Sequence, residues 1–163
     1  MEVRGDLLGY CENAALQKKY LSHGPNETQE IGFKIGKLLK PGDIVGLYGE
    51  LGSGKTTLVK GIARAFGIDE RDIVSASFTI ISGYNTNPPF THIDLYRIEK
   101  KAELIELGLW EQIGGDSVSV IEWAEKAEGE LPGDIIKVRL ESTGKNSREI
   151  MIEGIDEKNR NHL

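Results

Sequence analysis

Cysteine is almost absent from this 163-residue sequence, which contains only Cys11. A single cysteine can form no disulfide within the chain and cannot build a zinc site from several thiolates. Nothing in the neighbouring sequence would lower the pKa of this thiol, so we expect Cys11 to be unreactive.

The sequence also lacks an excess of positive charge. It contains 26 acidic and 20 basic residues, which gives a formal net charge of −6. Proteins that hold nucleic acids by themselves usually carry a basic surface, because neutralising phosphates supplies most of their affinity. We therefore do not expect this chain to hold RNA or DNA alone.

Long hydrophobic runs are missing as well. No apolar segment approaches the roughly 20 residues that a membrane-spanning helix needs. The first residues, MEVRGDLLGYCENAALQKKY, are interrupted by Asp6 and Glu12 and do not resemble a signal peptide. The sequence thus predicts a cytoplasmic protein that does not insert into membranes.

The residues that are present alternate between strand and helix patterns. We expect a short strand at 18–23, followed by a helix that Asn26 caps, with Gln29 completing the capping box. Small residues at Gly32 and Gly36 indicate that this helix packs closely onto a sheet. Its apolar stripe consists of Ile31, Ile35, Leu38 and Leu39.

Further segments follow the same alternation. We predict strands at 44–48, 78–84, 90–96 and 116–123, helices at 58–66 and 100–115, and an antiparallel hairpin of 134–140 with 148–154. Trp110, in the second of these helices, is expected in the core. The pattern predicts an α/β fold with a mixed, mostly parallel central sheet between two helical layers and an antiparallel C-terminal hairpin.

A phosphate-binding loop follows the apolar strand at 44–48. The segment GELGSGKT fits the P-loop pattern of Gly49, four residues, then Gly54-Lys55-Thr56. Its glycines allow backbone N–H groups to approach phosphate oxygens, and the following helix contributes its N-terminal donors. Lys55 supplies a cation for the β- and γ-phosphates, and the Thr56 hydroxyl is a suitable oxygen ligand for Mg²⁺. The sequence therefore predicts a nucleoside triphosphate site of the P-loop NTPase type.

Hydrolysis at such a site needs an acidic residue at the tip of a neighbouring strand. Asp94 and Glu122 each follow an apolar strand and are the two candidates, although either could be a helix cap or a solvated strand end. Hydroxyls that contact the γ-phosphate could come from Ser75, Ser77 or Thr79, which could equally be ordinary turn residues.

Two ring residues near these carboxylates allow different interpretations. His92 lies inside a strand pattern, which favours a structural histidine with a satisfied hydrogen bond. Trp123 follows Glu122 directly, so it would lie near the strand tip, where either core packing or a role at the nucleotide is consistent with the pattern.

Several separated segments together resemble the TsaE family, the small bacterial ATPases required for making threonylcarbamoyladenosine on tRNA. These segments are NETQEIG, PGDIVGLYGELGSGKTTLVKG, SASFTI, HIDLYR, ELGL and VIEW, and the resemblance as a whole runs from about residue 20 to residue 132. The resemblance implies an N-terminal extension at 1–17, one ATPase domain at 18–155 and a C-terminal tail at 156–163.

The resemblance also implies roles for individual residues. Lys55, Asp94 and Glu122 would be catalytic, and Thr56, Glu122 and Asp94 would hold Mg²⁺. Residues that would contact ATP are Thr28, Gly49, Glu50, Leu51, Gly52, Ser53, Gly54, Lys55, Thr56, Thr57, Ser77 and Trp123. This chain has Ser75-Ala76-Ser77-Phe78 where the family commonly has Ser-Pro-Thr-Phe. Ser77 keeps the hydroxyl, but the loop loses the fixed φ of proline.

By the same resemblance, the ATPase would act on the TsaB and TsaD proteins and would meet tRNA only indirectly. An alternative is a small-molecule P-loop kinase, although no insertion large enough for a lid is evident and Arg64, Arg71 and Arg97 are scattered. A regulatory GTPase is not favoured, because the Asn-Lys-x-Asp signature that reads guanine is absent.

Overall fold

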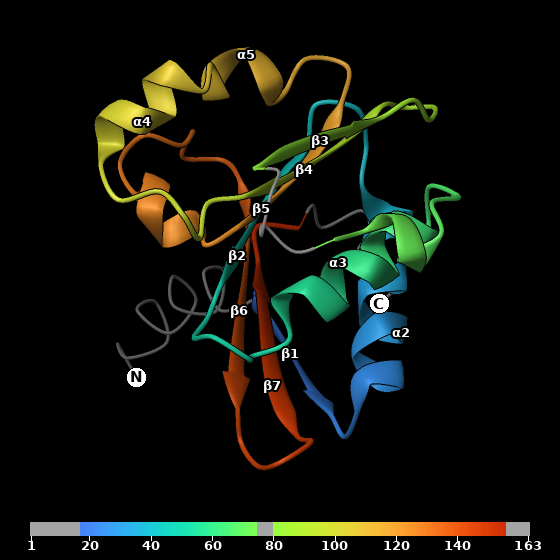
Figure 1. The fold of residues 1–163 in the computed structure, drawn as a ribbon. Helices are drawn as coiled ribbons and strands as arrows, with labels where there is room; N and C mark the ends of the chain where they lie inside the picture. The colour runs from blue at the N-terminus through green and yellow to red at the C-terminus, as the bar shows by residue number, and fades with distance from the viewer. Residues whose placement is uncertain (1–16, 75–79, 156–163) are drawn as a thin grey trace, which may run out of the picture.

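One mixed β-sheet forms the centre of the computed structural model, which describes residues 17–74 and 80–155 (Figure 1). Its strands are β1 (Gln17–Ser22), β2 (Ile44–Tyr48), β3 (Ile81–Tyr84), β4 (Phe90–Asp94), β5 (Val118–Glu122), β6 (Ile136–Ser142) and β7 (Arg148–Glu153). They are arranged in the order β1-β7-β6-β2-β5-β4-β3. The four central strands, β6-β2-β5-β4, run parallel, and antiparallel pairs complete both edges. The predicted mixed sheet and C-terminal hairpin are confirmed.

Helices cover both faces of this sheet, as expected for parallel strands that are apolar on both sides. They are α2 (Pro25–Leu38), α3 (Lys55–Arg64), α4 (Lys101–Glu106) and α5 (Leu109–Gln112), with short 3₁₀ helices η1 (Glu70–Asp72) and η2 (Ala124–Ala127). Figure 1 shows α2 and α3 together on one side and α4, α5 and η2 on the other. Two separate hydrophobic clusters, one on each face, confirm the three layers.

The carboxyl ends of the parallel strands bring the predicted acidic residues together. Asp94 and Glu122 are the last residues of β4 and β5, and they are register partners in that strand pair. Glu122 is also the register partner of Leu47, next to the end of β2. Both strands are buried along their whole length, so the two carboxylates lie at one edge of a rigid sheet, directly beside the loop that leaves β2.

Close packing of α2 on α3 explains the glycines of the first helix. A Cβ atom added at Gly36 would lie 2.6 Å from the Cβ of Ala65 and 2.7 Å from the Ile62 carbonyl oxygen. Gly32 faces the same helix, where an added Cβ would lie 3.0 Å from the Ile62 nitrogen. The prediction that these glycines pack against the sheet is therefore wrong, since their neighbour is α3.

The N-terminus of α2 also differs from the prediction. Gly24 is the N-cap and makes no side-chain cap, Pro25 occupies the first turn, and Asn26 lies inside the helix. Proline suits this position because its fixed φ is helical and its missing N–H would have had no helical partner. Glu27, rather than Gln29, reaches back and accepts a 2.8 Å hydrogen bond from the His23 backbone N–H.

The helix predicted at 100–115 is two short helices in the structure. Gly108 has a positive φ of 65° and separates α4 from α5. Trp110, predicted in the core, is 41% exposed, so that prediction is wrong. In the described ranges, 17–74 and 80–155, no helix combines the length and apolar character needed to cross a membrane.

Candidate functional site

The phosphate loop runs from the end of β2 to the start of α3, as the sequence predicts. Gly49, Gly52 and Gly54 all adopt positive φ values, of 153°, 78° and 101°. Gly54 is the N-cap of α3, and no side chain caps the first turn, which also contains no acidic residue. The N–H groups of that turn have no intrahelical partners, so this end of α3 is suited to an anion.

Lys55 is buried beneath the loop that it belongs to. Its ammonium donates hydrogen bonds to the Gly49 carbonyl at 2.5 Å and to the Glu50 carbonyl at 2.9 Å. The Nζ atom lies 4.0 Å from the centre of the Trp123 ring. Burial lowers the pKa of Lys55, and surrounding carboxylates, Glu125 foremost, oppose this effect. The cation is thus held in place by carbonyls and an aromatic face.

A chain of hydrogen bonds connects the first turn of α3 to two strands of the sheet. The Thr56 hydroxyl donates to Glu122 Oε1 at 2.7 Å. The other carboxylate oxygen, Oε2, lies 2.6 Å from His92 Nε2. Glu122 and His92 are 1% and 3% exposed. The carboxylate is therefore fixed at both oxygens, and a threonine hydroxyl and a carboxylate oxygen are presented side by side.

Asp94, the last residue of β4, and Trp123, the first residue after β5, adjoin this carboxylate. Asp94 Oδ1 accepts a 3.0 Å hydrogen bond from the Tyr96 backbone N–H. The Tyr96 and Trp123 rings stack at an angle, with centroids 5.2 Å apart. Lys126 donates to the carbonyls of Tyr96 and Ile98, which ties the two segments together.

Many of these groups line one cavity of about 660 Å³, large enough for a nucleotide. Its lining consists of Leu51, Gly52, Gly54, Lys55, Thr56, Thr57, Asp94, Tyr96, Arg97, Glu122, Trp123 and Arg148. The predicted residues Gly49, Glu50 and Ser53 instead line a neighbouring cavity of about 590 Å³. Most of the predicted site is thus gathered around a single hollow at the phosphate loop.

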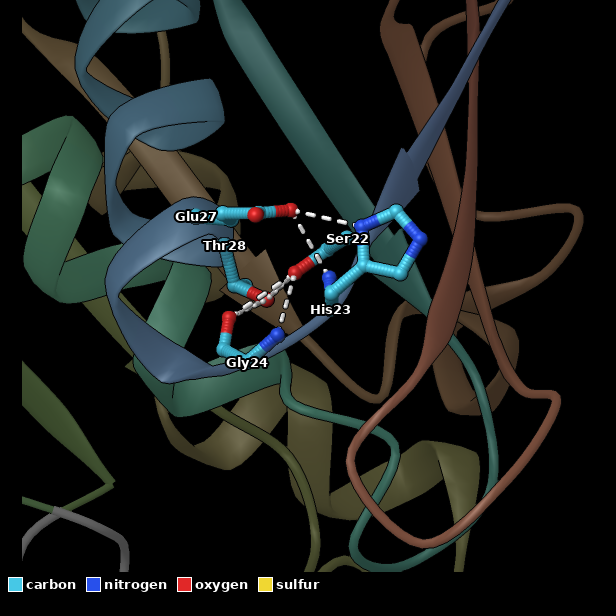
Figure 2. Close-up of polar contacts among 5 residues, drawn as sticks. All are labelled: Ser22, His23, Gly24, Glu27 and Thr28. Carbon is cyan, nitrogen blue, oxygen red and sulfur yellow. Dashed lines mark hydrogen bonds and ion pairs between the residues drawn. The ribbon is translucent and has the colours of Figure 1, made fainter.

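Thr28 lies at the N-terminus of α2, where it joins a cluster of polar contacts (Figure 2). Its hydroxyl lies 2.7 Å from that of Ser22 and donates to the Gly24 carbonyl at 3.2 Å. Together with Gly54 and Thr57, it lines a small cavity of about 60 Å³. Thr28 therefore adjoins the loop but is separate from the main cavity.

The structure brings to the site residues to which the sequence patterns gave no role there. His92, predicted to be structural, contacts the candidate metal ligand Glu122 directly. Arg97 and Arg148 line the main cavity, although Arg97 was interpreted as one of several scattered basic residues. Alternation within β4 could have revealed that His92 shares its face with Asp94, whereas no local signal indicates Arg148. Ser75, Ser77 and Thr79 lie outside the described residues.

Comparisons with known proteins agree with this geometry. The family model described as "Threonylcarbamoyl adenosine biosynthesis protein TsaE" matches residues 22–150. The tRNA threonylcarbamoyladenosine biosynthesis protein TsaE of Bacillus subtilis is 40% identical over 135 residues, covering 82% of this chain and 84% of the relative. The protein of the same name from Treponema pallidum is 35% identical and covers 81% and 97%.

A solved structure has the same fold. The crystal structure of Bacillus subtilis YdiB matches with a TM-score of 0.71 and 33% identity, covering 90% of each chain. The family model and the relatives each span most of the sequence, and the phosphate loop and both strand-tip carboxylates lie within the matched region. The chain therefore belongs to the TsaE family.

Proposed function

We propose that this protein is a Mg²⁺-dependent ATPase that serves the threonylcarbamoyladenosine modification of tRNA. The observation that carries the proposal is the fixed group of Thr56, Glu122 and His92 at the N-terminus of α3, beside Lys55 and in a nucleotide-sized cavity. The family to which the chain belongs supports the link to tRNA modification.

The residues of the site fit a phosphate chain with a magnesium ion. Anionic oxygens suit the end of α3, where N–H groups, the helix dipole and the buried Lys55 cation converge. Thr56 and Glu122 offer the hard oxygen ligands that Mg²⁺ prefers, at adjacent positions. When bound, the ion would neutralise charge that builds up on the phosphate oxygens during hydrolysis.

Each side chain then has a defined task. Lys55, held by the Gly49 and Glu50 carbonyls, positions a cation against the β- and γ-phosphates. His92 holds Glu122 in the orientation in which its other oxygen meets Thr56. Asp94, the register partner of Glu122 at the tip of the adjacent strand, supports hydrolysis and contributes to the Mg²⁺ site. Trp123 covers Lys55 and helps to exclude water from it.

The remaining predicted contacts belong to the same proposal. The loop from Gly49 to Thr57 surrounds the phosphates, while Thr28 and Ser77 contact the nucleotide from outside the loop. The ATPase domain spans 18–155, between an extension at 1–17 and a tail at 156–163. The family match at residues 22–150 supports this central unit.

The ATPase acts on partner proteins rather than on tRNA. The net charge of −6 does not favour direct RNA binding. We therefore propose that TsaB and TsaD, which together transfer the threonylcarbamoyl group, are its partners in the cytoplasm. ATP hydrolysis on this chain would reset their complex between turnovers.

A nucleotide panel separates this function from a small-molecule kinase. Calorimetry with ATP, ADP and GTP, each with and without Mg²⁺, should show binding of the adenine nucleotides that strengthens with Mg²⁺. Incubation with γ-labelled ATP and a small-metabolite extract should release label only as inorganic phosphate. Label recovered on a small molecule would reject the ATPase and support the kinase.

A further inference from the structure

Arg148 reaches from the C-terminal hairpin to the phosphate loop. It is the first residue of β7, and its NH2 group donates a 3.1 Å hydrogen bond to the Gly52 carbonyl, 96 residues away in the sequence. The guanidinium also lies close to Gly54, with Nε 3.8 Å from the position that a Cβ atom would occupy there. A residue of the hairpin thus contacts the part of the loop that surrounds the phosphates.

The other end of the guanidinium is anchored in the turn between β6 and β7. NH1 donates to Ser142 Oγ at 3.1 Å, to the Ser147 carbonyl at 2.9 Å and to the Gly144 carbonyl at 3.3 Å. NH1 has two N–H groups, so its three acceptors share two hydrogens, while NH2 points in a different, fixed direction and is left to bond Gly52. The side chain therefore bridges the turn and the loop.

This bridge fixes one peptide unit of the loop at both ends. The Gly52 carbonyl accepts from Arg148, and the N–H of the next residue, Ser53, donates to the Glu50 carbonyl at 3.1 Å. Gly52 has a φ of 78°. A Cβ atom added there would have no neighbour within 4 Å, so packing contributes little to fixing the backbone conformation of Gly52. The hydrogen bond from Arg148 restrains a position that glycine leaves free to rotate.

The positive charge of Arg148 also lies beside the phosphate loop. Within residues 17–74 and 80–155, the four oxygens that accept hydrogen bonds from its guanidinium are neutral, three of them carbonyls and one a hydroxyl. Arg148 lines both the main cavity and the small cavity beside Thr28, and Gly54 and Thr57 of the loop line both as well. Its positive charge therefore adds to the field that an anionic ligand meets there.

We propose that Arg148 is a positioning residue for nucleotide binding, which holds the phosphate loop in its binding-competent form from the C-terminal hairpin. The ligand class is the diphosphate unit of an adenine nucleotide, so the inference rests on the proposed function. A preorganised loop spends less binding free energy on ordering itself when the phosphates arrive.

The test compares Arg148→Gln with Lys145→Gln, which removes the same charge from an exposed side chain of the same turn. The first readout is hydrogen exchange without nucleotide. Deuterium uptake in peptides covering 49–57 should be faster in R148Q than in the wild type, and K145Q should match the wild type. Faster uptake confined to the turn at 143–147 would show that Arg148 only anchors the hairpin and would overturn the proposal.

The second readout is affinity for two probes, ADP and inorganic pyrophosphate, measured with Mg²⁺. Losing one charge-assisted hydrogen bond to the loop should weaken both by about tenfold in R148Q. Weaker binding of ADP but not of pyrophosphate would show that Arg148 acts on the nucleoside rather than on the phosphates, which would overturn the proposal. Unchanged affinity for both probes would overturn it too. Arg148→Lys keeps the charge but not the bridge, so it should also bind ADP more weakly than wild type. Wild-type ADP affinity in R148K would show that the charge alone suffices, and it would contradict a positioning role for Arg148.

The two proposals can fail separately. A wild-type protein that does not bind ADP would refute the proposed nucleotide function, whatever the variants do. Wild-type ADP binding combined with unchanged exchange and affinity in R148Q would refute only the role of Arg148. Thermal unfolding of each variant without nucleotide shows that the comparison is made on folded protein.

Discussion

Lys55 is buried at 5% exposure, and its ammonium contacts only neutral groups among its hydrogen-bond partners. A phosphate anion would therefore add a directly contacting counter-charge to the nearby carboxylates that already act on Lys55. Lys55→Ala should weaken ATP binding by about 2–4 kcal/mol, the cost of a charge-assisted contact in a partly desolvated site. Calorimetry with Mg-ATP measures the change, and Lys60→Ala on the same helix provides a control with equal charge loss. Undiminished ATP binding by K55A would refute the role of the loop.

Glu122 and Asp94 are neighbours with different surroundings, and we expect different effects from their amide variants. Glu122 contacts Thr56 and His92, whereas Asp94 accepts from the backbone of Tyr96. Glu122→Gln should raise the Mg²⁺ concentration needed for half-maximal activity, because an amide is a weaker ligand than a carboxylate. Asp94→Asn should lower turnover while ATP stays bound. Equal Mg²⁺ requirements and equal turnover in the two variants would show that the division of roles is wrong.

At the scale of elements, the contact between α2 and α3 holds Thr28 and the phosphate loop in one unit. Gly61 on α3 lies against the backbone of Gln29, whose carbonyl carbon would be 2.8 Å from an added Cβ. Because the contacting atoms belong to the backbones of the two helices, a methyl group at this position can be accommodated only if the helices move apart. Gly61→Ala should lower the free energy of unfolding by about 3 kcal/mol, at the upper end of the usual overpacking cost.

Chemical denaturation measures this change. The matched control is Gly133→Ala, because a Cβ there meets nothing within 4 Å and φ is not positive. G133A should stay close to the wild type. A G61A protein as stable as G133A would show that the two helices are not held at the distance observed here.

Elements with a strong local signal could be predicted from the sequence, and those defined by distant contacts could not. The apolar run of β2 followed by glycines predicted both the buried strand and the phosphate loop, since that order of residues has few structural alternatives. Small residues at Gly32 and Gly36 predicted close packing, but spacing alone does not identify the packing partner, which is α3 rather than the sheet. Gly108 was not recognised as a helix break.

The candidate site shows the same limit. Residues of the loop itself and the strand-tip carboxylates follow from motifs, because their chemistry is encoded in neighbouring positions. His92 and Arg148 act through partners 30 and 96 residues away, and only the parallel register of β4 with β5 and the hairpin after β6 bring them to the site. Side chains of this kind can be assigned to the site only once the strand topology is known, because no local sequence motif contains them.

At the scale of the whole molecule, the fold offers one sheet, two helical layers and a nucleotide-sized cavity. The proposed action on TsaB and TsaD implies that these partners complete the site. Groups supplied by another protein at a P-loop site can raise turnover by roughly 10³–10⁵. We therefore expect slow hydrolysis by the chain alone.

The most direct measurement is the rate of ATP hydrolysis by this protein alone, with TsaB and TsaD, and with tRNA and the threonylcarbamoyl donor added. Our account predicts a low rate for the protein alone and a marked increase with the two partners. The K55A variant should remain inactive in every mixture. A rate that is already high for the isolated chain, or one that no combination changes, would contradict the proposed function.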